Sequence, residues 1–195
     1  MCIRDSSIDA PCSYTLTTGG YIAYIGRLSY EKGYDLLVEV ARKHPEIKFC
    51  FAGAQREQKN TDIPSNVEFA GYLQKDKLLE FIQKARFIVI PSRCYEGFPM
   101  AILEAACHGK PAIAPNHGGF TEIIGQGENA IGKLFEPGNT DDLDKQIAEL
   151  WNNQTLTEEL GEKAFRKLKE HYDSEVVYKQ WETLFNKLKA PDIDR

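Results

Sequence analysis

The sequence predicts an α/β fold: one domain with a mainly parallel sheet, helices on both faces and a helical C-terminal end. Short β-rich segments alternate along the chain with segments whose apolar residues recur at helical spacing. The β-rich segments are apolar almost throughout, which is typical of parallel strands covered on both faces. With 195 residues, of which 42% are hydrophobic and 27% charged, the chain can bury one substantial core.

Six β-rich segments are predicted as strands, and glycine or proline follows most of them. They span residues 21–25, 47–52, 67–70, 87–90, 111–114 and 130–135. Helical spacing predicts helices over 31–44, 76–85, 99–108 and 120–124, and three more between 140 and 189, with breaks near 152–154 and 173. Pro99 suits the first position of its helix, where a missing N–H is no loss. The polar stretch 55–65 is predicted to be a loop.

The composition excludes several classes of protein. A net charge of -5 argues against a general nucleic-acid binder, which needs a surplus of Lys and Arg on one face. No apolar run approaches the roughly 20 residues that a membrane span needs. Five cysteines at irregular spacing form no disulfide framework, so a reduced, cytoplasmic protein is expected. Residues 1–20 are expected to be an unpatterned tail or an assembly scar, 21–189 the domain, and 190–195 a second tail.

The loop after the first strand, GRLSYEKG at residues 26–33, contains two cations. Parallel sheets bind ligands beyond the carboxyl ends of their strands, so polar residues there are candidate site residues. Arg27 and Lys32 flank the turn and are expected to converge on an anion such as a diphosphate near the start of the next helix. A solvated turn with two ordinary surface cations explains the spacing equally well. The patterns GxGxxG and GxxxxGK[ST] are absent, which argues against dehydrogenases and P-loop NTPases.

The loop after the fourth strand, SRCYEGFP at residues 92–99, begins a second polar constellation. Glu96 lies in this loop, where a carboxylate can accept hydrogen bonds from sugar hydroxyls. Glu104 lies inside the following helix among apolar neighbours, where a carboxylate can hold a vicinal diol such as that of ribose. The simpler alternatives are an acid that favours a helix N-terminus for Glu96 and an exposed helix position for Glu104.

Small residues and free amides accompany these two carboxylates. Gly97 lets a backbone approach a ligand closely. The N–H groups of Phe98, Met100 and Ala101 are expected to face the space beyond the helix start. A weaker signal is NHGG at residues 116–119, which permits a close approach but also suits an ordinary tight turn. For His117 a turn-capping role is favoured over ligand binding.

Six segments, in this order, resemble one family. They are GRLSYEKG, FAG, VEFAGYL, PSRCYEGFPMAILEAACHGKPAIA, GGFTEII and FEPG. Over about residues 21–188 the chain is similar to the C-terminal, donor-binding half of family-4 retaining glycosyltransferases, which have two facing Rossmann-like domains. The resemblance implies a single Rossmann-like domain here. It also implies transfer of a hexosyl or related group, with retention of configuration, from a nucleotide-diphosphate sugar to a glycan, lipid or small-molecule acceptor.

The resemblance also assigns roles to residues. Arg27, Lys32 and Glu96 are the expected catalytic residues: the cations hold the diphosphate and stabilise the departing nucleotide, and Glu96 contacts the donor sugar. The expected donor-binding residues are Gly26, Leu73, Gly97, Phe98, Met100, Ala101 and Glu104. Glu104 would hold the ribose hydroxyls, and the loop at Leu73 would meet the base. No metal and no cofactor is expected, the nucleotide sugar being a substrate.

Two other functions stay open at this point. The chain can be a truncated or non-catalytic module that only binds a nucleotide sugar, or an epimerase or phosphorylase of similar fold, which the motifs favour less. The resemblance implies a missing N-terminal domain of the same enzyme as partner, without which the chain is expected to be inactive, and a peripheral membrane contact through that domain. An apolar stripe near the C-terminus packs either on the chain's own core or on that partner. Its members are Tyr178, Trp181, Leu184, Phe185 and Leu188.

Overall fold

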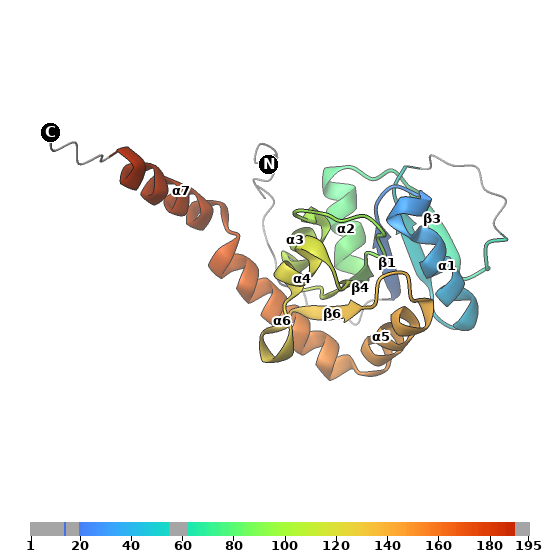
Figure 1. The fold of residues 1–195 in the computed structure, drawn as a ribbon. Coiled ribbons are helices and arrows are strands. Elements are labelled where there is room, and N and C mark those ends of the chain that lie inside the picture. Colours follow the sequence, from blue (N-terminus) through green and yellow to red (C-terminus); the bar gives the residue numbers. More distant parts are fainter. Residues whose placement is uncertain (1–13, 15–19, 55–61, 190–195) are drawn as a thin grey trace, which may run out of the picture.

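A sheet of six parallel strands, in the order β3-β2-β1-β4-β5-β6, forms the centre of the molecule (Figure 1). The computed structural model describes residues 14, 20–54 and 62–189. The strands are β1 Tyr21–Ile25, β2 Phe49–Ala52, β3 Val67–Gly71, β4 Ala85–Val89, β5 Ala112–Pro115 and β6 Gly132–Phe135. Each strand pairs with its neighbours in parallel, which confirms the predicted fold class.

Helices cover both faces of this sheet. The α-helices are α1 Tyr34–Lys43, α2 Lys75–Lys84, α3 Met100–Ala106, α4 Gly118–Ile124, α5 Thr140–Asn152, α6 Gln154–His171 and α7 Ser174–Lys189, with 3-10 turns η1 Tyr30–Lys32 and η2 Gly127–Asn129. Helices α1 and α5 pack into the core on one face, α2, α3 and α4 pack into the core on the other, and α6 contributes to both. The central strands β1, β2, β4 and β5 are therefore largely shielded from solvent on both faces, and their ends are accessible.

The two faces of the sheet carry side chains of different size. In β2, Phe49 and Phe51 face α1 and α5, whereas Cys50 and Ala52 face the other core. The same alternation occurs in β5, where Ile113 lies on the α1 side and Ala112 and Ala114 on the other, whereas β1 carries bulky side chains on both faces. Alternation follows from the two-residue period of a strand.

The first predicted helix, 31–44, is wrong in its first turn. The chain forms the 3-10 turn η1, then passes through Gly33 with a positive φ of 68°, and only then enters α1. Few residues besides glycine adopt this backbone conformation. Gly33 also lies so close to Pro91 that a Cβ would overlap the Pro91 carbonyl oxygen. Helical spacing alone cannot reveal this break, because it is set by a contact between distant segments.

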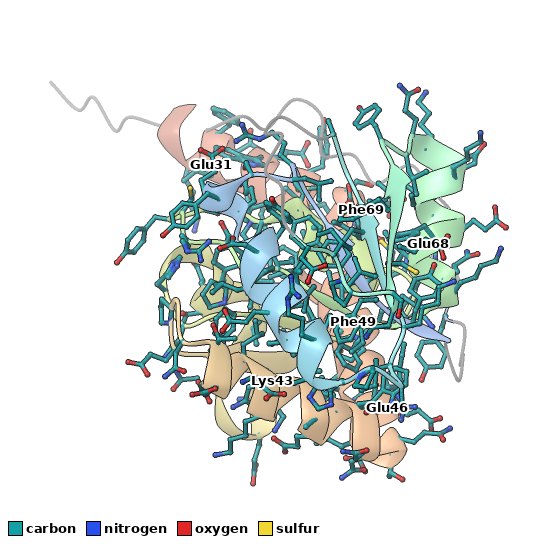
Figure 2. The ribbon with its side chains drawn as sticks, turned by 90° about the vertical axis from the view of Figure 1, so that its right-hand side faces the viewer. Glu31, Lys43, Glu46, Phe49, Glu68 and Phe69 are labelled. Atoms are coloured by element: carbon teal, nitrogen blue, oxygen red, sulfur yellow. The ribbon has the colours of Figure 1, made fainter. Side chains whose placement is uncertain are left out.

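Strand β3 forms one edge of the sheet and is largely exposed, as Figure 2 shows for Glu68 and Phe69. Phe69 still contacts the ring of Phe51 in β2, at a centroid distance of 5.4 Å. Most of the predicted loop 55–65 lies outside the described residues. Most of the predicted tail 1–20 also lies outside the described residues. Tyr14, which is described, packs its ring on that of Phe165 at a centroid distance of 5.6 Å.

Helix α7 extends away from the domain (Figure 1). Its contact with the domain runs through α6, and three large apolar side chains are exposed: Tyr178 by 69%, Leu184 by 46% and Phe185 by 53%. Trp181 stacks on Phe185 at 5.7 Å. Of the two alternatives left open for the stripe, packing on the domain's own core is therefore wrong for these three side chains. The side chain of Leu188 lies outside the described residues.

Candidate functional site

The two loops that the sequence singles out follow neighbouring strands at the centre of the sheet. β1 leads into loop 26–33, and β4 leads into loop 90–99. The strand that comes after β1 in the chain lies on one side of this pair, and the strand that comes after β4 lies on the other, so the strand order reverses here. At such reversal points a crevice opens outside the carboxyl ends of the strands, and α/β proteins bind ligands in it.

Lys32 and Glu96 meet across this point. The Lys32 Nζ atom donates to Glu96 Oε1 at 2.7 Å, and each side chain is 23% exposed. Sixty-four residues separate them in the chain, so the contact depends wholly on the pairing of β1 with β4. A cation and a carboxylate predicted for the same site are thus brought together.

Arg93 holds the same two loops together, and the sequence analysis did not single it out. Its guanidinium donates to both carboxylate oxygens of Asp35, at 2.7 and 2.9 Å, and to the Tyr30 carbonyl oxygen at 2.6 Å. It also lies 4.0 Å from the centroid of the Tyr30 ring. With Gly33 packed on Pro91 beside it, this contact makes the η1 turn and the β4 loop one rigid unit. A guanidinium four residues after the end of β4 was the available signal, but spacing in the sequence does not reveal its partner.

Arg27 does not share the partner of Lys32. It pairs instead with Glu31 at 2.7 Å, and both side chains are more than 40% exposed, at 42% and 47%. The neighbouring Gly26 ends β1, and Gly53 lies directly against its carbonyl oxygen with no room for a Cβ. The loop backbone is fixed further by the bond from Leu28 N to Ala54 O at 3.0 Å. The backbone of the loop at Arg27 is therefore fixed, whereas the Arg27 side chain stays exposed beside Glu31.

Glu104 is half-buried on α3, so the alternative of an exposed helix position is wrong. Burial raises the pKa of its carboxyl group. Within the part of the chain that the structure describes, no hydrogen bond or ion pair engages this carboxylate. A half-buried acid without a partner is costly, since desolvation disfavours the charged form. Such a group is a candidate ligand contact rather than a structural one.

The segment between the two carboxylates is open. No atom lies within 4 Å of the place that a Cβ on Gly97 would take, and Phe98 is 49% exposed with its ring against Tyr172 at 5.7 Å. Met100 and Ala101 are half-buried, and their N–H groups precede the first backbone hydrogen bond of α3, which Ile102 donates to Pro99 at 3.1 Å. These amides belong to the α3 start that the sequence predicts.

Leu73 lies farther from the pair of loops than the other predicted residues. It follows the edge strand β3, and β2 separates β3 from β1. Two strand spacings amount to about 10 Å. Its side chain packs partly on the core beneath α2 and α3, while its neighbour Tyr72 is 70% exposed.

His117 does not cap its turn, so the role favoured from the sequence is wrong. It occupies the position before α4, but its side chain makes no capping hydrogen bond. Both ring nitrogens are buried and lack a hydrogen-bond partner among the described residues. The ring lies between Tyr95, at a centroid distance of 4.5 Å, and Phe120, at 5.6 Å.

The arrangement can be compared with known proteins. The family described as Glycosyl transferases group 1 matches residues 15–167. The chain belongs to this family. It is 36% identical over 145 residues to an uncharacterized glycosyltransferase of Methanocaldococcus jannaschii, a match that covers 71% of this chain and 40% of the relative.

Two solved structures extend the comparison. A variant of S. aureus TarM, in complex with fondaparinux, alpha-GlcNAc-glycerol and UDP, is 26% identical with a TM-score of 0.74, over 92% of this chain and 38% of that one. The C-terminal domain of the group 1 glycosyl transferase LpcC from Francisella tularensis has a TM-score of 0.66 and 21% identity, which shows the fold alone. That likeness covers 80% of this chain and 88% of the other. The chain thus spans less than half of the curated relative and of TarM, and most of an isolated domain.

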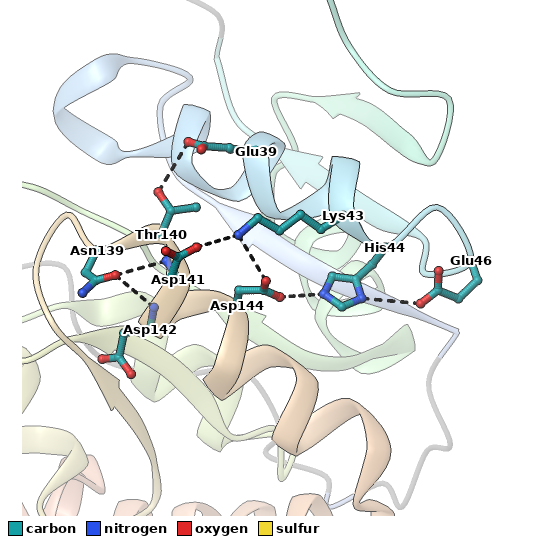
Figure 3. A network of polar contacts seen from close by, with 9 residues as sticks. All are labelled: Glu39, Lys43, His44, Glu46, Asn139, Thr140, Asp141, Asp142 and Asp144. Carbon is teal, nitrogen blue, oxygen red and sulfur yellow. Dashed lines mark hydrogen bonds and ion pairs between the residues drawn. The ribbon is translucent and has the colours of Figure 1, made fainter.

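This group 1 domain has a second charged cluster away from the strand ends, between α1 and α5 (Figure 3). We call it the helix-junction network: Lys43, His44, Glu46, Asp141 and Asp144. Lys43 binds Asp141 at 2.8 Å and Asp144 at 3.3 Å. His44 binds Asp144 at 2.6 Å and Glu46 at 3.5 Å. Every member has a partner of opposite charge or a hydrogen-bond partner within the network, which joins the two helices.

The described residues contain neither a cluster of metal ligands nor a membrane-spanning helix. Among residues 14, 20–54 and 62–189, no three His, Cys, Asp or Glu side chains gather where they could hold a metal ion. None of the helices in the described part of the chain is long and apolar enough to cross a membrane.

Proposed function

We propose that this chain is the donor-binding half of a family-4 retaining glycosyltransferase, which transfers a sugar from a nucleotide-diphosphate sugar to a glycan, lipid or small-molecule acceptor. One observation carries the proposal: Lys32 and Glu96 lie 2.7 Å apart where the strand order reverses between β1 and β4. The first suits a diphosphate and the second suits sugar hydroxyls. A ligand that combines both groups meets both residues at once.

The two cations have separate tasks. Lys32 is half-buried and fixed by Glu96, so it offers a positioned charge for the diphosphate. Arg27 is held only by the exposed Glu31, and an exposed ion pair of this kind contributes little. Arg27 therefore exchanges Glu31 for a phosphate oxygen at small cost. When the bond from the sugar carbon to the diphosphate oxygen breaks, the negative charge that grows on this oxygen is stabilised by both cations.

The remaining residues orient the donor. Glu104 accepts hydrogen bonds from the ribose hydroxyls, which gives its half-buried carboxylate the partners that it lacks. Glu96 and the amides between Gly97 and Ala101 hold the sugar and phosphate, and the backbone near Leu73 meets the base. Two side-chain cations in place of a metal ion make the reaction metal-independent in this proposal.

The proposal includes a second domain. The curated relative and TarM are more than twice as long as their matched portions, and the described α7 presents Tyr178, Leu184 and Phe185 to solvent. Exposed apolar side chains in one row mark a contact surface. We therefore propose that α7 packs on an N-terminal domain of the same enzyme, which supplies the acceptor site. A peripheral membrane contact would belong to that domain, and the enzyme would act in the cytoplasm.

Titration calorimetry with UDP, GDP and ADP tests the donor site. At least one diphosphate should bind, and its sugar conjugate should bind with it. Absence of binding to all three would refute the proposal and the binding-module alternative together. Transfer to an acceptor is expected only once an N-terminal half is supplied. Binding that never leads to turnover, even then, would favour the non-catalytic module.

A further inference from the structure

The imidazole of His117 carries an unexplained cost. Both of its ring nitrogens are buried without a hydrogen bond in the described structure, although the residue as a whole is only half-buried. Burying a polar group without a partner lowers the stability of the folded protein. An apolar side chain between Tyr95 and Phe120 would avoid this cost. An imidazole at this position is therefore better explained by a partner that is not part of the chain.

The ring lies beside the residues proposed to hold the sugar. Gly119, two residues after His117, donates its N–H to the Glu96 carbonyl oxygen at 2.8 Å. Gly118 and Gly119 lie so close to this loop that a Cβ on Gly118 would be 3.2 Å from the Glu96 oxygen, and one on Gly119 would overlap the Gly97 oxygen. The turn at His117 and the Glu96 loop are thus in direct backbone contact. Whatever Glu96 binds is within the neighbourhood of His117.

Tyr95 covers the imidazole and is easily moved. Its side chain is 81% exposed, and its contact with His117 is a single tilted ring pair at 4.5 Å. A ring pair of this kind is weak enough that one hydrogen bond between the imidazole and an uncharged group of a ligand can compensate for its loss. Rotation of Tyr95 away from the ring would expose the imidazole without disturbing the core side, where Phe120 is fully buried.

We propose that His117 is a specificity-determining residue for the donor, whose imidazole hydrogen-bonds a hydroxyl of the sugar once Tyr95 has turned aside. This inference rests on the proposed function and extends it, because it assigns a side chain to the sugar rather than to the nucleotide. The sugar is favoured over the diphosphate because the turn at His117 is in backbone contact with Glu96, the residue to which the proposal assigns the sugar hydroxyls.

The test compares a nucleotide sugar with its free diphosphate. UDP-glucose, UDP-N-acetylglucosamine, GDP-mannose and ADP-glucose are titrated into the chain, and the tightest one is used with its own diphosphate. His117→Phe keeps a ring between Tyr95 and Phe120 but removes both nitrogens. Its affinity for the nucleotide sugar should fall about tenfold while its affinity for the diphosphate stays unchanged. Its melting temperature should be equal to that of the parent or higher, because an unpaired polar group is removed.

A second variant does not depend on how well the first one folds. Tyr95→Ala changes an exposed side chain and uncovers the imidazole, so the nucleotide sugar should bind roughly two- to threefold more tightly. His171→Phe, at a histidine whose side chain is 60% exposed, is the control and should leave both affinities unchanged.

Each outcome decides between the claims. If His117→Phe binds the nucleotide sugar as the parent does, or loses both ligands equally, the assignment to the sugar is overturned while the proposed function stands. Destabilisation without any change in affinity would make His117 a structural residue and overturn it as well, as would a Tyr95→Ala variant that does not bind more tightly. A parent that binds no nucleotide refutes the proposed function and this inference with it.

Discussion

The strand-end region and the helix-junction network are both rich in charge, but their charges are paired in different ways. We define the strand-end region as the three loops at residues 26–33, 90–99 and 116–119 together with helix α3. In the helix-junction network, Lys43 and Asp144 each contact two partners, and Asp141 is 91% exposed (Figure 3). In the strand-end region, the carboxylate of Glu104 and the ring of His117 have no polar partner among the described residues.

The paired charges of the helix-junction network indicate a structural role, whereas the unpaired groups of the strand-end region indicate ligand binding. A network that only joins two helices can satisfy all of its own groups, because nothing else needs them. A binding site has to keep some groups free for its ligand, and it accepts a stability cost for doing so. The same region is nevertheless the more rigidly built, since Gly33, Pro91 and Arg93 lock its loops together.

The largest expected effect comes from the glycine that joins the two strand-end loops. Gly33→Ala introduces a Cβ that overlaps the Pro91 carbonyl oxygen, on a backbone with a φ of 68°. We expect the free energy of unfolding to fall by at least about 3 kcal/mol, measured by urea denaturation.

Gly138 offers the matched control beside the helix-junction network. Its φ is 79°, yet nothing lies within 4 Å of the place that a Cβ would take. Gly138→Ala should therefore cost only the strain of the backbone, about 1 kcal/mol. Equal losses for the two variants would mean that the strand-end loops are not locked by this contact.

The next effect concerns ligand affinity and separates the two lysines. Lys32→Met removes the cation that the proposal assigns to the diphosphate, and affinity for the diphosphate that binds best should fall about 100-fold in calorimetry. Lys43→Met removes the central cation of the helix-junction network and should leave that affinity unchanged. A similar loss in both variants would assign the effect to net charge rather than to a site.

A smaller effect distinguishes two arginine–aspartate pairs by stability. In the strand-end region Arg93 and Asp35 are 24% and 33% exposed, whereas Arg42 pairs with Asp62, which is 94% exposed. Arg93→Met should lower the free energy of unfolding by about 2 kcal/mol, because it leaves a half-buried carboxylate and a carbonyl oxygen without their donor. Arg42→Met should cost less than about 1 kcal/mol in the same denaturation experiment. If the order is reversed, the Arg93 contact does not hold the loops.

The sequence predicted the fold well because strand and helix spacing are local properties. β1 matches the predicted segment 21–25, and β4 and β5 differ from theirs by one or two residues at their ends. Glycines and prolines mark most of the ends, and apolar runs mark the strands. The two loops of the site followed from the same reasoning, since parallel strands direct their carboxyl ends to one edge.

What the sequence could not predict depends on contacts between distant segments. The break at Gly33 is set by Pro91, the orientation of Arg27 by Glu31, and the bonds of Arg93 by Asp35. His117 is the clearest case. Its position before two glycines predicts a turn-capping residue, but its ring makes no hydrogen bond with the described residues. Side-chain partners of this kind arise only when the loops are assembled.

The smallest expected effect tests whether Glu104 is held in a costly state. Burial raises the pKa of its carboxyl group in the folded protein above the ordinary value of a glutamate. Above that raised pKa the charge is present in both folded and unfolded chains and disfavours folding. Glu104→Gln should therefore increase the free energy of unfolding at pH 7, by less than about 1 kcal/mol, while it weakens nucleotide binding.

The raised pKa of Glu104 also predicts how the stability difference between parent and variant changes with pH. As the pH falls through the raised pKa the parent takes up a proton in the folded state, and below the ordinary pKa of a glutamate it is protonated in both states. The advantage of Glu104→Gln should therefore shrink with falling pH in denaturation curves, and the exposed Glu182→Gln on α7 should show no such trend. A Gln variant that is less stable at pH 7 would show that the Glu104 carboxylate is paired, and that the strand-end region satisfies its charges as fully as the helix-junction network does.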